Sequence, residues 1–211
     1  MKLFDPEGPV MVALGKLADL VFCNVLFCLC SIPIFTLGAS LTALFDCTLS
    51  ISEDKEEQLI VKQFWNAFRS NFRRATLLWL ICLGVIAVLV LYSLVVNAMS
   101  GPLYRVYRVT FYVLVFLFLA GFQYVFPLQA RFHTGVKATL KTAWLLSAAA
   151  LPWTLCALAV AAAAIYISFF MAPGTVNVFI FLWAFVIIAI IAYLNSFFYR
   201  LAFRKLPEQP N

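Results

Sequence analysis

The side chains that chemistry would need are sparse in this chain, and they fall mainly at the ends of apolar runs. Asp46 follows a long apolar run, and Thr42 and Ser50 share its face of a helix at four-residue spacing. A carboxylate flanked by two hydroxyls could bind a proton or a cation, or form a polar seam against a neighbouring helix. It equally suits an interfacial carboxylate at the depth of lipid headgroups, which is the interpretation we favour.

Three amide side chains lie within apolar runs, namely Asn24, Gln123 and Asn195. Amides in a membrane form hydrogen bonds between helices, each contributing roughly 0.6–2 kcal/mol. They could instead line a path for a hydroxyl-rich solute such as a sugar. We favour helix packing, and we expect Gln123 and Asn195 to lie at a similar depth, which makes them candidates for mutual contact.

Residues for catalysis or metal binding show no recognisable pattern. His133 is the only histidine, and no nucleophile or carboxylate lies near it in sequence. The six cysteines form no CxxC pair, and a zinc site needs clustered cysteine and histidine ligands. We therefore expect no catalytic residue, no cofactor and no metal, and predict that the protein is not an enzyme.

The composition indicates a chain whose solvent is lipid. Of its 211 residues, 65% are hydrophobic and 11% are charged, and the run from Thr142 to Tyr199 contains no charged residue. Since backbone groups in lipid must be paired internally, we predict an all-α, polytopic transmembrane helical bundle forming one membrane domain over residues 1–211. The net charge of +6 does not indicate nucleic-acid binding, because the cations flank apolar runs rather than gather in one patch.

We predict five spans, because each crossing needs about 20 apolar residues. They cover residues 17–37, 75–96, 109–127, 143–170 and 177–198. Turns are expected at Gly101-Pro102 and Pro173-Gly174, and a tilt or kink at Pro152 in the fourth span. Residues 17–51 leave two interpretations open, because Ile32-Pro33 and Gly38-Ala39-Ser40 interrupt the apolar region. They form either a kinked span followed by a short helix, which we favour, or a re-entrant hairpin.

Lysine and arginine are distributed unequally between the two sides of this arrangement. One side would carry Lys55, Lys62, Arg69, Arg73, Arg74, Arg131, Lys137, Lys141, Arg200, Arg204 and Lys205. The other side would carry Lys2, Lys16, Arg105 and Arg108. The positive-inside rule predicts a multi-pass membrane protein with its C-terminus in the cytoplasm and its N-terminus outside.

Two basic amphipathic segments precede predicted spans. Residues 59–74 carry Ile60, Phe64, Phe68 and Phe72 every four positions, and residues 131–141 carry a similar stripe. We expect both to lie in the headgroup plane, where basic side chains act as interfacial anchors. These anchors are Arg69, Arg73, Arg74, Arg131, Lys137 and Lys141. The repeated order of amphipathic helix and hairpin predicts a parallel repeat over residues 59–127 and 131–199. The acidic stretch Glu53–Glu57 is interpreted as a solvated loop rather than a docking point.

Three motifs, in order, resemble the YesL family of bacterial membrane proteins. They are Ile32-Pro33-Ile34-Phe35-Thr36-Leu37-Gly38-Ala39-Ser40, Phe64-Trp65-Asn66-Ala67-Phe68-Arg69-Ser70-Asn71-Phe72 and Phe126-Pro127-Leu128-Gln129-Ala130-Arg131-Phe132. His133 departs from the family, where an acidic residue is common. The resemblance implies a membrane protein of unknown function, often accompanying sugar-uptake ABC transporters and polysaccharide-degrading enzymes.

We therefore predict a non-enzymatic accessory component of carbohydrate transport of the ABC type. Its expected partners are the lipid bilayer with anionic headgroups and the permease or ATPase subunits of such a transporter. The alternatives are a small secondary transporter or channel with a path between the two repeats, and an enzyme acting on lipid-linked substrates.

Overall fold

The computed structural model describes all residues except 1–8, 56–58, 102, 169–175 and 207–211, and within that part it is helical without strands. The helices are α1 (Pro9–Cys30), α2 (Leu37–Glu53), α3 (Ile60–Ala98), α4 (Tyr104–Phe132), α5 (Val136–Ala149), α6 (Leu151–Tyr166), α7 (Val176–Leu182) and α8 (Ile188–Phe203). A short 3-10 helix, Ile34–Thr36, precedes α2, and a π-helical segment, Trp183–Ile187, joins α7 to α8. The all-α prediction is confirmed. Pro102 and the expected turn at Pro173-Gly174 lie outside the described residues.

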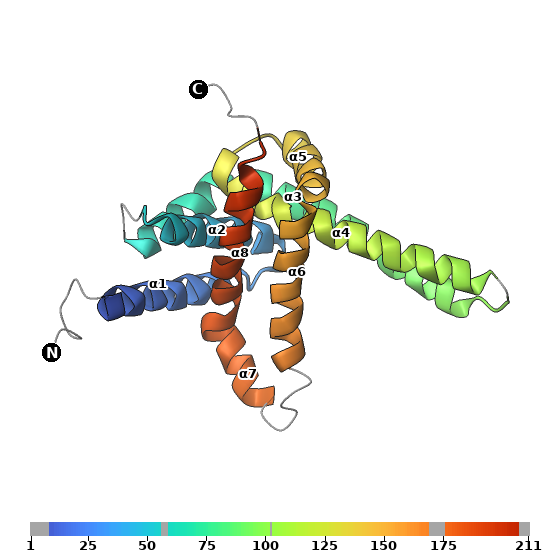
Figure 1. Cartoon of the computed structure of the whole chain (residues 1–211), viewed down its shortest axis with the longest axis horizontal. Coiled ribbons are helices and arrows are strands. Elements are labelled where there is room, and N and C mark those ends of the chain that lie inside the picture. The colour runs from blue at the N-terminus through green and yellow to red at the C-terminus, as the bar shows by residue number, and fades with distance from the viewer. Residues whose placement is uncertain (1–8, 56–58, 102, 169–175, 207–211) are drawn as a thin grey trace.

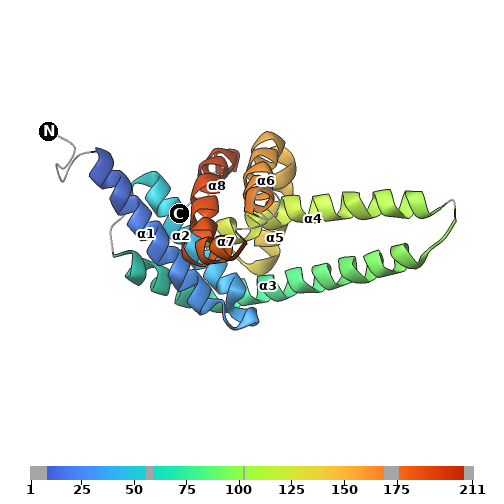
Figure 2. The ribbon, with the colours of Figure 1, turned by 90° about the horizontal axis from the view of Figure 1, so that it is seen from below.

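Two helical hairpins leave a common core in different directions. Helices α3 and α4 project side by side away from the rest, and α6 runs beside α7 and α8 along another axis (Figures 1 and 2). Helices α1 and α2 lie on the side opposite to the α3–α4 tip (Figure 1). Large apolar side chains such as Val88, Leu91 and Val113 are exposed along the projecting hairpin, as expected of surface that faces lipid.

Five helices in the described residues are long and apolar enough to cross a membrane. They cover Val10–Cys30, Ile34–Glu53, Ile60–Ala98, Tyr104–Phe132 and Val178–Phe203, the last running through the π-helical segment. The predicted spans 75–96 and 109–127 fall within two of them, and the predicted span 177–198 overlaps the last from Val178 on. The segment predicted as one span at 143–170 is instead a bent pair, α5 and α6, with 98° between them.

The bend between α5 and α6 follows from Pro152, which occupies the first turn of α6 and has no N–H to continue α5. Thr154 braces the break, since its hydroxyl is 3.1 Å from the carbonyl oxygens of both Ser147 and Ala150. Tyr124 of α4 hydrogen-bonds the same hydroxyl at 3.0 Å. The expected kink is therefore a sharp corner held from a neighbouring helix.

The stretch predicted as one span at 17–37 is divided between two helices in the structure. Helix α1 ends at Cys30, Pro33 interrupts the chain, and α2 then runs back beside α3. Lys16 of α1 lies 2.5 Å from Asp54 at the end of α2, so the two residues cannot lie on opposite sides of a bilayer. The hairpin alternative describes the arrangement better, and α2 is the helix with the largest buried share among the candidate spans.

Gly38 allows α2 to approach α3 closely. A Cβ atom at this position would lie 2.6 Å from Cβ of Trp79 and closer still to the carbonyl oxygen of Ala75. The Trp79 indole N–H donates to the carbonyl oxygen of Ile34 at 2.8 Å and so anchors the turn before α2. Gly38 and Trp79 together fix the crossing point of the two helices.

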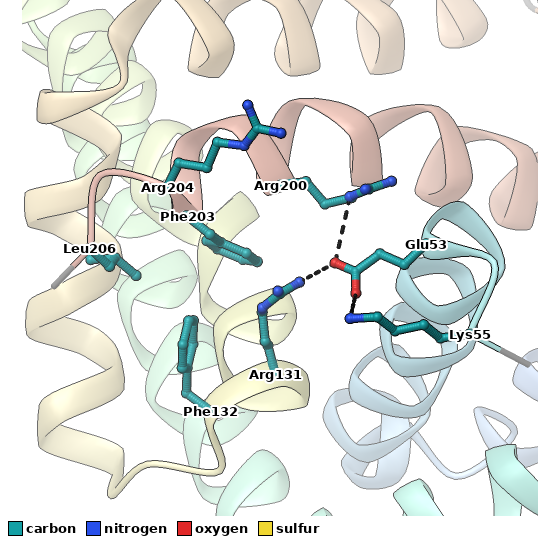
Figure 3. Close-up of a pocket in the computed structure, with 8 residues that line it drawn as sticks. All are labelled: Glu53, Lys55, Arg131, Phe132, Arg200, Phe203, Arg204 and Leu206. Carbon is teal, nitrogen blue, oxygen red and sulfur yellow. Dashed lines mark hydrogen bonds and ion pairs between the residues drawn. The ribbon is translucent and has the colours of Figure 1, made fainter. Parts of the chain in front are cut away.

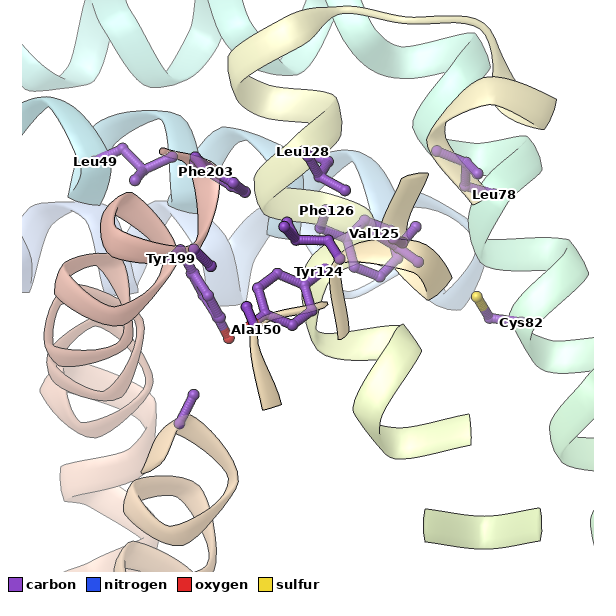
Figure 4. Packing of buried hydrophobic residues seen from close by; sticks show 14 of the residues in the cluster. Leu49, Leu78, Cys82, Tyr124, Val125, Phe126, Leu128, Ala150, Tyr199 and Phe203 are labelled. Atoms are coloured by element: carbon purple, nitrogen blue, oxygen red, sulfur yellow. The ribbon is translucent and has the colours of Figure 1, made fainter. Parts of the chain in front are cut away.

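The two predicted amphipathic stripes face protein in the structure. Ile60 and Phe64 are buried against side chains of α1 and α2. They belong to α3, which runs from Ile60 to Ala98 without a break, so the predicted amphipathic segment is not a separate helix. Val136 and Leu140 pack against a second apolar cluster in which α2, α3, α4, α5 and α8 meet (Figure 4). The predicted parallel repeat stays a prediction: its first copy has one continuous helix where the second has a sharp bend.

Replacing Gly38 by alanine is expected to lower the free energy of unfolding by roughly 2 kcal/mol, because overpacking typically costs 1–3 kcal/mol. Gly84→Ala is the matched control. Gly84 also lies inside a helix, α3, but no atom lies within 4 Å of the methyl group that alanine would add. That variant should be neutral or gain up to about 1 kcal/mol from helix propensity. Thermal unfolding in detergent measures both, and equal midpoints for the two variants would contradict the close contact.

Candidate functional site

A single carboxylate joins the ends of three helices. Glu53, the last residue of α2, accepts hydrogen bonds from Arg131 of α4 and from Lys55 at 2.9 Å, and lies 3.5 Å from the guanidinium of Arg200 in α8 (Figure 3). Its side chain is only 13% exposed. Because these residues are far apart in sequence, the cluster exists only where the tertiary fold brings α2, α4 and α8 together.

The helix ends explain why cations gather here. The last carbonyls of a helix have no intrahelical donor, and its C-terminus carries roughly half a negative charge. Arg200 donates to the carbonyl oxygen of Ser52, and Lys205 donates to that of Ala149 at 2.6 Å. Arg131 stands in the last turn of α4, and its guanidinium also lies 5.7 Å from the ring centroid of Phe203.

A pocket of about 530 Å³ opens beside the Glu53 cluster (Figure 3). It is lined by Glu53, Lys55, Arg131, Phe132, Arg200, Phe203, Arg204 and Leu206. Four cationic side chains therefore surround one carboxylate, and three apolar side chains form the remaining wall. This charge balance suits an anion with an apolar portion.

A buried polar network fixes the end of α4 against α3 and α5. The Gln129 amide donates to Oδ1 of Asn71 at 3.2 Å and accepts from the Thr139 hydroxyl at 3.0 Å. Nδ1 of His133 lies 3.0 Å from the same Asn71 oxygen, and Arg74 donates to the His133 carbonyl oxygen. His133 is therefore part of a structural network at the C-cap of α4, where its φ of 47° is left-handed.

The predicted seam at Asp46 has a partner from α3. The Gln63 amide donates to the Asp46 carboxylate at 3.0 Å and to the Ser50 hydroxyl at 2.7 Å. Thr42 is buried and hydrogen-bonds the Gly38 carbonyl oxygen of its own helix, so it does not join this pair. Asp46 and Ser50 also line a pocket of about 390 Å³ with Lys55 and His133.

Asn24 is fully buried and supports the π-helical segment. Its amide donates to the carbonyl oxygens of Trp183 at 3.0 Å and Ala184 at 2.7 Å, and its oxygen accepts from the N–H of Ala189 at 2.8 Å. A π-helical turn shifts the regular hydrogen-bond ladder, and π-bulges occur frequently at functional sites. Here the side chain from α1 satisfies the altered backbone.

Gln123 and Asn195 have separate environments in the structure. The Gln123 amide donates to the carbonyl oxygen of Thr154 at 3.2 Å. Asn195 is buried, and its Oδ1 atom has no hydrogen-bond partner in the described part of the chain. No hydrogen bond between the two amides is found within the described ranges, and the ring pair Tyr124–Tyr199 lies nearby in sequence on the same two helices, with centroids 5.2 Å apart.

The predicted basic anchors divide into two groups. Arg131 belongs to the Glu53 cluster described above. Five others are exposed to solvent or lipid: Arg69, Arg73, Arg74, Lys137 and Lys141. The Arg69 guanidinium lies 5.0 Å from the ring centroid of Trp65. Arg69, Arg73 and Arg74 line one hollow together with His133, and Arg74 donates to the His133 carbonyl oxygen.

Sequence reasoning missed the roles of Glu53, Gln63 and Arg200. Glu53 was assigned to a solvated acidic loop, but it ends α2 and is largely buried. The available signal was its position at the end of the helix that carries Asp46 and Ser50, because a carboxylate at a helix end can meet cations from the ends of other helices. Within the described residues, no group of three or more histidine, cysteine or acidic side chains is placed to hold a metal ion.

Comparison with known proteins gives a family likeness without a function. A family model described as "Protein of unknown function, DUF624" matches residues 20–93, a range that includes α2, Gly38 and Glu53. "Uncharacterized protein YteU" of Bacillus subtilis (strain 168) is 29% identical over 153 residues, which cover 72% of this chain and 68% of the relative. No solved structure matches the chain.

Glu53→Gln is expected to lower the free energy of unfolding by roughly 2 kcal/mol, because three cations lose their shared carboxylate. The value is below the 3–5 kcal/mol of a fully buried pair, since Arg131 and Arg200 are about one-third exposed. Asp54→Asn is the control, as this neighbouring carboxylate is 77% exposed and should change stability by less than about 1 kcal/mol. Denaturation in detergent compares them, and an unchanged Glu53→Gln protein would show that the cluster is not structural.

Proposed function

We propose that this chain is a non-enzymatic bacterial cell-membrane protein that serves as an accessory subunit of an ABC-type carbohydrate transporter. The observation that carries the proposal is a basic face. It consists of Lys55, Arg131, Arg200 and Arg204 around Glu53, and of Arg69, Arg73 and Arg74 beside His133. The five helices with the length and hydropathy of membrane spans support placement in a bilayer. A polar face at the ends of such helices is suited to contact other proteins at the membrane surface.

The same face is proposed to be cytoplasmic. Lys16 and Asp54 are paired at 2.5 Å, so the start of α1 joins the side that carries Arg131 and Arg200. Arg105 and Arg108 stand at the opposite end, near the tip of the α3–α4 hairpin. The positive-inside rule then favours a cytoplasmic C-terminus together with a cytoplasmic N-terminal segment, in place of the external N-terminus expected from one crossing at 17–37.

The charge of this face indicates the chemistry of the partner. Exposed cations on α3 and α5 include Lys62, Arg69, Arg73, Arg74, Lys137 and Lys141. Three of them line a second hollow of about 750 Å³ together with His133. Complementary charge steers association and orients partners, so an acidic cytoplasmic surface of a permease or ATPase subunit is the proposed contact.

Interior packing gives less support to the alternative of a small secondary transporter or channel. The Gln123 amide is engaged by Thr154, and the cluster beside it consists of apolar and aromatic side chains such as Tyr124, Phe126 and Tyr199 (Figure 4). A solute path between the two hairpins would require polar groups facing an open space. This alternative is favoured by Oδ1 of Asn195, which is buried and has no hydrogen-bond partner among the residues that the structure describes.

The link to carbohydrate transport rests on the resemblance of the three motifs to the YesL family. The DUF624 description and the name of YteU state no function. The Ile32–Ser40 motif contains Gly38, which forms the close contact between α2 and α3, and the third motif contains Gln129 and Arg131. Two of the three motifs therefore build the core and the basic face on which the proposal depends.

Purification from native membranes in mild detergent tests the proposal. The wild-type protein is expected to bring down a permease or ATPase subunit of a sugar transporter. The double variant Arg69→Glu/Arg73→Glu should reduce recovery of that subunit by about tenfold or more. Like charges that face each other across an interface cost up to several kcal/mol of binding free energy, and each 1.4 kcal/mol weakens the affinity about tenfold.

The matched control is Arg105→Glu, which reverses an exposed cation at the far end of the α3–α4 hairpin. It should leave recovery unchanged. Absence of any transporter subunit from the wild-type preparation would contradict the accessory role, and equal losses in both variants would contradict docking through the basic face.

A further inference from the structure

Three candidate membrane spans end at the pocket beside Glu53. The spans Ile34–Glu53, Tyr104–Phe132 and Val178–Phe203 each contribute their final residue to its lining. At this pocket three apolar helices end in charged side chains, which is the kind of boundary that lipid headgroups contact.

The charge in the pocket remains positive after its internal partners are counted. Lys55, Arg131, Arg200 and Arg204 face one carboxylate, Glu53. Even when about half a negative charge is added for each of the three helix C-termini, the balance stays above about +1. Basic pockets between transmembrane helices on the cytoplasmic side are sites where anionic lipid headgroups bind.

Two of these cations have N–H donors that no described hydrogen bond uses. Lys55 has three N–H donors and contacts Glu53 at 2.9 Å. The Arg204 side chain is exposed and makes no hydrogen bond or ion pair with the part of the chain that the structure describes, and Figure 3 shows its guanidinium pointing away from Glu53. An arginine fork matches phosphate oxygens in a bidentate geometry.

The apolar side of the pocket indicates a ligand that has an apolar portion as well as a negative charge. Phe132, Phe203 and Leu206 line the same pocket, and Phe132 and Phe203 contact each other with ring centroids 5.6 Å apart. A volume of about 530 Å³ is within the range of small-molecule sites. A ligand with a phosphate at one end and an apolar portion at the other would satisfy both walls.

We propose that this pocket binds the phosphate group of an anionic phospholipid, such as phosphatidylglycerol, with Arg204 as the cation that contacts the phosphate and Lys55 as a further cation of the pocket lining. The site is separate from the group Arg69, Arg73 and Arg74 on the basic face and does not depend on a transporter partner. Bound lipid would bridge α2, α4 and α8 at the ends that Glu53 already joins.

The test measures binding of short-chain phosphatidylglycerol to the full-length purified protein in detergent, by tryptophan fluorescence. Arg204→Gln should weaken the apparent Kd roughly tenfold, the value of one charge-assisted hydrogen bond. Lys141→Gln removes an exposed cation outside the pocket and should change the Kd by less than about twofold. Because Arg204 is exposed, both variants should unfold at the wild-type temperature without lipid.

Two further arms identify the source of the phosphate. Phosphatidylcholine, which carries a phosphate but no net charge, should bind more weakly than phosphatidylglycerol. Glycerol phosphate that fails to compete assigns the site to lipid, whereas competition at the concentration of the lipid supports a phosphate site open to soluble esters. Equal effects of Arg204→Gln and Lys141→Gln, or no binding of either phosphate compound, would overturn the proposal.

Discussion

The close approach of α2 to α3 at Gly38 is the contact on which the rest of the arrangement depends. Without a side chain at this position, the backbone of α2 lies against Ala75 and Trp79, and α2 runs antiparallel to the first half of α3. That crossing places α2 between α1, α3, α4 and α8, where most of its length is buried. It also determines where α2 ends, and so where the Glu53 carboxylate meets the cations of α4 and α8.

The helix ends that this packing brings together form a positively charged surface. Three helix C-termini converge, and cationic side chains satisfy their carbonyl oxygens or pair with Glu53. Once these partners are satisfied, the surface still carries excess positive charge, both in the pocket and in the hollow beside His133. The same physical requirement, pairing of exposed helix-end carbonyls, thus supports both the fold and the proposed contacts with acidic proteins and lipid phosphates.

The helices were predictable from uncharged runs, because burial in lipid leaves a strong compositional pattern. The central place of α2 was not, since Asp46 and Ser50 resemble interfacial residues until Gln63 of α3 is seen beside them. Pro33 marked the break after α1, but only the Lys16–Asp54 pair shows that the chain turns back. Glu53 meets Arg131 and Arg200 through tertiary contacts alone, so sequence spacing could not indicate the cluster.

The returning path of α1 and α2 is tested most directly by labelling from outside intact cells. Single cysteines at Lys16, Asp54 and Arg105, in a variant lacking the six native cysteines, would be exposed to a membrane-impermeant thiol reagent. The account predicts that only Arg105→Cys reacts, because Lys16 and Asp54 lie together on the side that we propose to be cytoplasmic. Reaction of Lys16→Cys from outside, with Asp54→Cys protected, would contradict it.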